Sequence, residues 1–354
     1  MREGIVGEAL TRWLSRERLE VLLAQARTCR VGVVGDLALD GYWVADMTRA
    51  RLSRETPHFP RPVVAERYAP GAGANVAQNL SALGVARTEA LSVIGDDWRG
   101  GLLTQALRAQ GVDVGRMLVS SQRGTTAYIK PLLTGYESQQ EDARLDFENA
   151  EPPAAEVEDE LIARVAGALD ELDALFVADQ FEIHGVVSER VREALIGLAR
   201  EHRDKVFVAD SRCRIGWFRG MVVKPNRAEA AAALSPGGTL GGRGEAEALS
   251  RLTEGPVVLT LSGEGALVWD EGTVAHVPAA PVAPPLDPVG AGDAFGAALT
   301  VALACGASLP EAAAMANLAA AVTVEKLGQT GTATPDEIVA RYEMAASGDS
   351  GATL

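Results

Sequence analysis

The sequence predicts an α/β fold in which a mostly parallel central sheet carries helices on both faces. Short apolar runs such as residues 30–36, 174–178 and 206–210 have the length and composition of buried strands. Helical stretches such as residues 186–201 alternate with these strands, and such alternation is typical of parallel sheets covered by helices. A chain of 354 residues with 47% hydrophobic content is long enough for one large domain of this class or two domains.

The N-terminal half begins with a predicted amphipathic helix over residues 4–28, so residues 1–29 are expected to form an N-terminal helical extension. Residues 41–69 mix aromatic side chains, arginines and prolines, and this composition predicts a small protruding β flap, or lid. A glycine-rich loop and a helix follow at residues 69–83. Further strands are predicted at 91–95, 125–133 and 140–147, and a helix at 100–110.

The C-terminal half begins after residues 150–158, whose Pro and Glu content predicts a linker. Residues 239–244 are expected to form a glycine-rich loop. The main domain is expected to span residues 30–340 and a tail residues 341–354. The remaining elements are strands at 174–178, 206–210, 221–223, 257–261 and 266–269, and helices at 186–201, 227–234, 292–305 and 310–326.

Composition and charge exclude several classes of protein. A formal net charge of −15 argues against nucleic acid as a partner. No uncharged apolar run is long enough to cross a membrane, and the acidic N-terminus does not resemble a secretory signal. Cys29, Cys213 and Cys305 are odd in number and far apart in the sequence, which fits free thiols in a reducing cytoplasm.

Residues 290–293 form the stretch that most strongly suggests chemistry. A Gly-Ala-Gly turn runs directly into an apolar, alanine-rich helix, whose first amides have no partner within the helix. Such an end binds anions, and glycine lets a phosphate approach the backbone. Asp293 would repel a phosphate, so it makes sense as a base acting on a hydroxyl while the amides hold a phosphoryl group. Taken alone, the stretch could equally be a tight turn followed by a helix-capping carboxylate.

Residues 287–295 resemble the DxxGAGDxF signature of the PfkB/ribokinase family of carbohydrate kinases. Four other stretches match further motifs of this family in the right order, at residues 35–40, 71–77, 224–229 and 260–265. The resemblance implies a ribokinase-like three-layer fold with a small β lid and ATP-dependent phosphotransfer to a sugar. Within the family, residues 35–43, 144–148 and 325–332 look closest to the kinase domain that acts on D-glycero-β-D-manno-heptose 7-phosphate.

The resemblance also implies roles for individual residues. Asp293 would be the catalytic base, with Gly290, Ala291 and Gly292 as further donors of the anion hole. The acceptor sugar would be bound by Asp40, Gly73, Asn75 and Arg144, and the nucleotide by Asn226, Thr260, Gly263, Gly265 and Asn317. Glu229 would organise Mg²⁺, and Asp287 would belong to a monovalent-cation site.

A phosphorylated acceptor needs a second anion site. Arg144, or the flap arginines Arg49, Arg51 and Arg54, could supply it through bidentate contacts, although a charged flap could also be a solvated surface.

The expected partners are ATP, Mg²⁺, a sugar or sugar phosphate, and a second copy of the chain. A homodimer is expected to form through the lid, because residues 42–43 and 63–64 give it an apolar surface. Two alternatives stay open. A ribokinase-like or nucleoside kinase could use Tyr42, Trp43 or Phe59 to stack on its substrate. A non-catalytic regulator could bind sugar or nucleotide, although it would have no use for a base such as Asp293.

Overall fold

The computed structural model describes residues 10–234, 242–328 and 330–347. In this part of the chain the central sheet has nine strands in the order β16-β15-β14-β13-β12-β11-β1-β4-β6. The strands from β6 to β14 are parallel, and β15 and β16 add an antiparallel edge. The bounds are β1 (Arg30–Gly35), β4 (Arg87–Leu91), β6 (Val112–Asp113), β11 (Ala174–Asp179), β12 (Val206–Ser211), β13 (Val222–Val223), β14 (Val257–Thr260), β15 (Ala266–Asp270) and β16 (Thr273–Val277).

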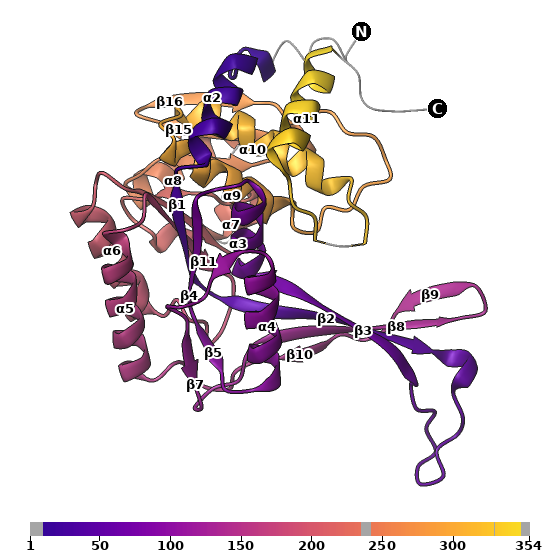
Figure 1. Ribbon diagram of the computed structural model, residues 1–354. Helices are drawn as coiled ribbons and strands as arrows, with labels where there is room; N and C mark the ends of the chain where they lie inside the picture. The colour runs from indigo at the N-terminus through magenta and orange to yellow at the C-terminus, as the bar shows by residue number, and fades with distance from the viewer. Residues whose placement is uncertain (1–9, 235–241, 329, 348–354) are drawn as a thin grey trace.

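Helices cover both faces of this sheet (Figure 1). Successive side chains of the central strands enter different cores, as Phe176 and Val177 of β11 do, because side chains alternate across a strand. One core contains α2 (Arg16–Ala26), α3 (Gly73–Ala82), α4 (Trp98–Ala109), α9 (Ala291–Ala304), α10 (Leu309–Val324) and α11 (Pro335–Ser347). The other contains α5 (Ala155–Leu169), α6 (Glu189–Glu201), α7 (Arg227–Leu234) and α8 (Gly242–Thr253). The predicted three-layer α/β fold is confirmed.

The lid is a second sheet that projects from the body of the molecule (Figure 1). Its strands are β2 (Leu37–Asp46), β3 (Val63–Ala72), β8 (Ala127–Gly135), β9 (Ser138–Glu141) and β10 (Leu145–Phe147). β2 pairs with β3 in antiparallel fashion and with the distant β8 in parallel fashion. The lid therefore takes in residues well beyond the expected flap at 41–69. A small third sheet pairs β5 (Val93–Gly95) with β7 (Leu118–Ser120).

Several predicted elements differ from the structure. The predicted linker at 150–158 is wrong, because α5 begins at Ala155, where acidic residues in the first turn favour a helix N-terminus. The elements α8, α11 and β16 were not predicted, and the expected boundary at residue 340 falls inside α11. The described part of the N-terminal extension contains α2; residues 1–9, residues 348–354 of the tail and residues 239–241 of the glycine-rich loop lie outside the described residues.

Two cysteines that are far apart in the sequence are neighbours in space. The Sγ atoms of Cys29, just before β1, and Cys305, at the end of α9, lie 3.2 Å apart as free thiols. Among the described residues no helix is both long and apolar enough to span a membrane.

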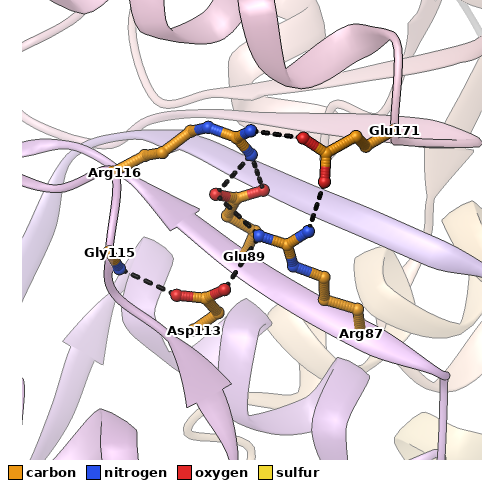
Figure 2. Close-up of polar contacts among 6 residues, drawn as sticks. All are labelled: Arg87, Glu89, Asp113, Gly115, Arg116 and Glu171. Atoms are coloured by element: carbon orange, nitrogen blue, oxygen red, sulfur yellow. Dashed lines mark hydrogen bonds and ion pairs between the residues drawn. The ribbon is translucent and has the colours of Figure 1, made fainter.

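A network of ion pairs stabilises the β4–β6 edge of the sheet (Figure 2). Glu89 in β4 is fully buried, and its two carboxylate oxygens accept bonds of 2.8 and 2.7 Å from Arg116. Arg87 contacts the same carboxylate at 3.4 Å and also bonds Asp113 of β6. Both arginines reach Glu171, after α5, at 2.6 Å. Glu89 thus ties the edge strand to the α5–β11 connection.

We expect Glu89→Gln to lower the free energy of unfolding by about 3 kcal/mol, because it leaves two arginines without their shared buried charge. Glu160→Gln is the matched control. It removes an exposed i,i+4 pair with Arg164 and should cost no more than about 0.5 kcal/mol. Urea unfolding followed by circular dichroism measures both. Equal stability of the two variants would contradict the structural role of Glu89.

Candidate active site

Charged side chains converge at the carboxyl ends of the parallel strands, where open α/β sheets bind their ligands. Asp210 lies near the end of β12, and Lys224 directly follows β13. Their side chains are 5 to 9% exposed, and the Lys224 Nζ lies 3.2 Å from Asp210 Oδ2. Burial opposes the charge of Lys224, but Asp210, Glu229 and Asp293 together raise its pKa above the usual value. Lys224 therefore stays a cation inside a cluster of carboxylates.

The N-terminus of α9 lies beside this lysine. Gly290 adopts the left-handed conformation with φ 81°, and a Cβ there would come within 2.4 Å of Thr330 Cγ2, so only glycine fits. A Cβ at Gly292 would lie 4.0 Å from Lys224 Nζ, which places the ammonium group next to the start of the helix. The helix end and the lysine thus present positive charge at one point.

The four amides of the expected anion hole are not equivalent. The Ala291 amide donates to the Pro288 carbonyl at 3.2 Å, and the Asp293 amide donates to the Gly290 carbonyl at 3.1 Å. The Gly290 and Gly292 amides donate to no acceptor in the described part of the chain. Two donors are therefore open to a ligand.

Asp293 lies in the first turn of α9 and faces the cluster. Burial and the negative charge of Asp210 raise its pKa to about 7, against the opposing effects of Lys224, a hydrogen bond from Asn75 and Arg212. Asn75 of α3 is buried, and its Oδ1 accepts a 3.1 Å bond from Gln78, which leaves its amide hydrogens for Asp293. The structure therefore places Asn75 beside Asp293, a contact that was not predicted.

A cavity of about 300 Å³ opens between the lid and the ends of β11 and β12. Its lining is mostly polar and comes from the lid, from the residues after β11 and from Arg212. The lining residues are Thr126, Tyr128, Arg144, Asp146, Glu148, Asn149, Gln180, Phe181, Glu182, Ile183, His184 and Arg212. Of the four arginines considered as anion ligands, Arg144 lines this cavity, whereas Arg49, Arg51 and Arg54 lie exposed on the lid and do not.

Asp40 of β2 belongs to the same region. Burial raises its pKa to about 6, against the opposing charges of Lys130, Arg144 and Arg212. Arg144 itself bonds Asp146 twice at 2.6 Å and stacks on Tyr128. Gly73 has a packing reason to be glycine, because a Cβ there would lie 2.6 Å from Ala178 Cβ.

Asn226 and Glu229 form a reciprocal cap at the start of α7. The Asn226 side chain accepts the Glu229 amide at 2.9 Å, and the Glu229 carboxylate accepts the Asn226 amide at 2.7 Å. Thr260 donates its amide to the Pro225 carbonyl next to them at 2.9 Å. Burial and the charge of Asp210 raise the pKa of Glu229, and one of its carboxylate oxygens makes no hydrogen bond in the described part of the chain.

The other residues expected near the nucleotide have structural contacts. Gly265 has φ 92°, and a Cβ there would lie 2.1 Å from the Val277 carbonyl oxygen. Asn317 donates to the carbonyls of Val277 and Pro278 at 3.2 and 3.0 Å, so its amide anchors the end of β16. Gly263 is exposed with open space around it.

Asp287 anchors the loop before α9. Its two oxygens accept the amides of Val289 and Gly328 at 3.1 and 3.0 Å. Its carboxylate therefore joins the loop before α9 to the loop after α10. No cluster of three or more candidate metal ligands occurs among the described residues.

Sequence reasoning missed Asp210, Lys224 and Arg212. A usable signal was present, because Lys224 directly precedes the Pro-Asn of the 224–229 motif and must share its place at the end of β13. Asp210 and Arg212 follow an apolar run, where the carboxyl end of a parallel strand is expected.

Comparisons with known proteins find relatives over most of the chain. A model of the pfkB family of carbohydrate kinases matches residues 43–336. The bifunctional protein HldE of Geobacter metallireducens is 33% identical over 334 residues, which cover 92% of this chain and 65% of that protein. HldE of Azorhizobium caulinodans is 34% identical over 92% of this chain and 67% of its own length. The chain thus spans about two thirds of the length of these relatives.

Solved structures share the fold. Ribokinase of Thermotoga maritima superposes with a TM-score of 0.67 at 22% identity, covering 89% of this chain and 99% of the ribokinase. Phosphofructokinase-2 of Escherichia coli, crystallised with potassium, gives a TM-score of 0.70 at 21% identity, with 90% and 99% coverage. The predicted ribokinase-like fold is therefore confirmed.

The raised pKa of Asp293 can be tested by titration. Since the charge of Asp210 helps to raise the pKa of Asp293 to about 7, Asp210→Asn should move that pKa well below 7. Nuclear magnetic resonance of ¹³Cγ-labelled aspartate measures the titration, and Asp293→Asn identifies the signal. A midpoint near 4 in the unmodified protein, or no change in Asp210→Asn, would contradict this description.

Proposed function

Because the chain belongs to the pfkB family of carbohydrate kinases, we propose that its site transfers the γ-phosphoryl group of ATP to a hydroxyl of a sugar phosphate. The motifs favour a heptose 7-phosphate as the acceptor. One observation carries the proposal: a half-buried carboxylate with a pKa of about 7, Asp293, lies beside a buried ammonium group and two open amides. A site that only bound sugar or nucleotide would have no use for such a base.

Asp293 is the general base of the proposed reaction. A carboxylate with a pKa near 7 is half ionised at neutral pH and accepts a proton more readily than an ordinary Asp. Asn75 donates to it and fixes its orientation. The acceptor hydroxyl would therefore lose its proton to Asp293 as it attacks phosphorus.

Lys224 and the amides of Gly290 and Gly292 hold the transferring group. Negative charge spreads over the phosphoryl oxygens during transfer, and donors already in place stabilise it. Asp210 keeps the Lys224 ammonium group directed at this point. ATP would arrive with Mg²⁺, which neutralises the phosphates; Glu229, with one open oxygen, fits a metal held through few carboxylates and several waters.

The acceptor would occupy the cavity beneath the lid. Asp40 and Asn75 do not line this cavity, but Asp40 is electrostatically coupled to Arg144 and Arg212, which do. Beside the cavity the two residues offer an acceptor and a donor for hydroxyl groups. Three cations, Lys130, Arg144 and Arg212, act electrostatically on Asp40. Arg144 is already paired with Asp146, whereas Arg212 makes no ion pair in the described part of the chain and lines the cavity. A neutral sugar has no need of them, whereas a sugar phosphate brings an anion that arginine binds well.

The nucleoside alternative receives less support from the cavity. Tyr42, Trp43 and Phe59 do not line it. Trp43 donates to the Tyr68 hydroxyl at 3.1 Å, Tyr42 stacks against Arg67, and Phe59 is 64% exposed. Tyr42 and Trp43 therefore already have partners within the lid, and Phe59 lies on its surface outside the cavity lining.

The remaining expectations are part of the proposal. The exposed Val63 and Val64 of the lid support a homodimer formed through that sheet, which light scattering would measure. A monovalent cation near Asp287 rests on the motif alone. We place the enzyme in the cytoplasm, where ATP is available.

Asp293→Asn tests the base directly. We expect turnover to fall at least about a thousandfold without loss of the fold, because an amide cannot accept the proton.

In the unmodified enzyme, kcat/KM should fall tenfold per pH unit below about pH 7, as Asp293 becomes protonated. Lys224→Met removes a charge that lowers this pKa, so it should shift the profile to higher pH as well as slow transfer. Near-normal turnover of Asp293→Asn would refute the assignment.

The acceptor class is tested with paired phosphorylated and free sugars, including heptose 7-phosphate, by coupled ADP release. The phosphorylated member should be preferred at least about tenfold in kcat/KM. Arg212→Met should remove most of this preference while leaving the KM for ATP within about twofold, because Arg212 lines the cavity. Equal use of free and phosphorylated sugars would end the sugar-phosphate proposal and leave the kinase assignment intact.

A further inference from the structure

The segment between β11 and α6 forms one wall of the acceptor cavity. Five consecutive residues, Gln180 to His184, line the cavity, and we call residues 180–186 the wall loop. Loops of this length on a protein surface are usually mobile. This one is held to the body by side chains that do not line the cavity themselves.

Asp36, at the end of β1, binds the wall loop from the inside. Its side chain is fully buried. Its Oδ2 accepts the amides of Gln180 and Phe181, both at 2.8 Å, and its Oδ1 accepts the Val186 amide at 2.6 Å. Both ends of the loop therefore meet on one carboxylate. A Cβ at Gly185 would lie 2.9 Å from each Asp36 oxygen, so the loop packs directly on this anchor.

Arg214 binds the same loop from the other side. Its Nη2 donates to the Phe181 carbonyl at 2.6 Å, and its Nη1 donates to the Glu182 carbonyl at 2.9 Å. Asp179, which is fully buried, accepts the Arg214 Nε at 3.0 Å and fixes the guanidinium group. The planar guanidinium group of arginine suits this position, because the one side chain bonds two carbonyls and a carboxylate at once.

The wall loop is also joined to the catalytic cluster. The Gln180 amide group donates to Asp210 Oδ2 at 3.2 Å, and its oxygen accepts the Arg212 Nε at 3.2 Å. Asp210 is the partner of Lys224. The position of the loop therefore determines where Arg212 and the acceptor lie relative to the phosphoryl-transfer point.

We propose that Arg214 and Asp36 are positioning residues that hold the wall loop in its acceptor-binding shape, and so set the affinity for the acceptor. The inference rests on the proposed function, which places the acceptor in this cavity. A loop fixed before binding loses less conformational freedom when the ligand arrives. Within the described part of the chain, the residues expected at the nucleotide make no hydrogen bond or ion pair with the wall loop, so the effect falls on the acceptor and not on ATP.

Arg214→Lys is the central experiment. Lysine keeps the charge beside Asp179 but lacks the planar fork that bonds both carbonyls and Asp179 at once. We expect the KM for the best sugar phosphate of the panel to rise about tenfold, with the KM for ATP within about twofold. Arg190→Lys is the matched control, since Arg190 is an exposed residue of α6 that pairs with Asp159, and it should change nothing. An unchanged acceptor KM in Arg214→Lys, or a parallel rise in both KM values, overturns the inference.

Hydrogen exchange gives a readout that does not depend on activity. The amides of residues 180, 181 and 186 should exchange at least about tenfold faster in Arg214→Lys, whereas α6 should be unaffected; unchanged exchange overturns the proposed anchoring. Gly185→Ala, which pushes the loop from Asp36 without touching the cavity lining, should reproduce both effects and replaces Arg214→Lys if that variant does not fold. An unmodified enzyme that phosphorylates no sugar phosphate refutes the proposed function instead, and the exchange experiment still decides the anchoring.

Discussion

The buried ion pair between Lys224 and Asp210 is the contact on which the arrangement of the site depends. Three carboxylates, Asp210, Glu229 and Asp293, act electrostatically on this one lysine. Without its charge they would repel one another in a place that water reaches poorly, and part of the cluster would take up protons. The lysine also brings positive charge to the start of α9, where two amides are open. One cation thus allows acidic groups and an anion-binding helix end to share a small volume.

The sheet explains why these groups meet. The register of β12 and β13 pairs Ala209 with Val223. The next residue of each strand is Asp210 and Lys224, so these two residues lie side by side at the carboxyl ends of the two strands. Strands buried on both faces need apolar side chains along their length, and polar chemistry is confined to their ends. The antiparallel strands β2 and β3 carry the chain from Asp40 out into the lid and back to Asn75. Both residues therefore lie at the base of the lid, on the proposed acceptor side of the site. The fold therefore supplies the location, and short polar segments supply the chemistry.

Much of the fold followed from local patterns. Apolar runs located β1, β11 and β12, and the glycine turn located the start of α9 and Asp293. What failed depends on long-range pairing: β8 joins β2 across more than eighty residues, and no local pattern shows that the two form one lid. The signal for α5 was hidden because prolines and glutamates were interpreted as a linker, although glutamates also begin helices. Among site residues, Lys224 and Arg212 were missed, because their roles depend on burial and on neighbouring side chains that are distant in the sequence.

Two carboxylates in this region show how contacts separate an anchor from a base. Burial and the charge of a neighbouring Asp together raise the pKa of both Asp36 and Asp293 to about 7. Asp36 is fully buried and accepts three backbone amides, so its carboxylate is held against the wall loop and away from solvent. Asp293 has one side-chain donor, Asn75, and keeps lone pairs free for a proton from an incoming hydroxyl. The raised pKa alone would make both residues candidates for the base. The hydrogen bonds leave Asp293 as the group able to act on a hydroxyl.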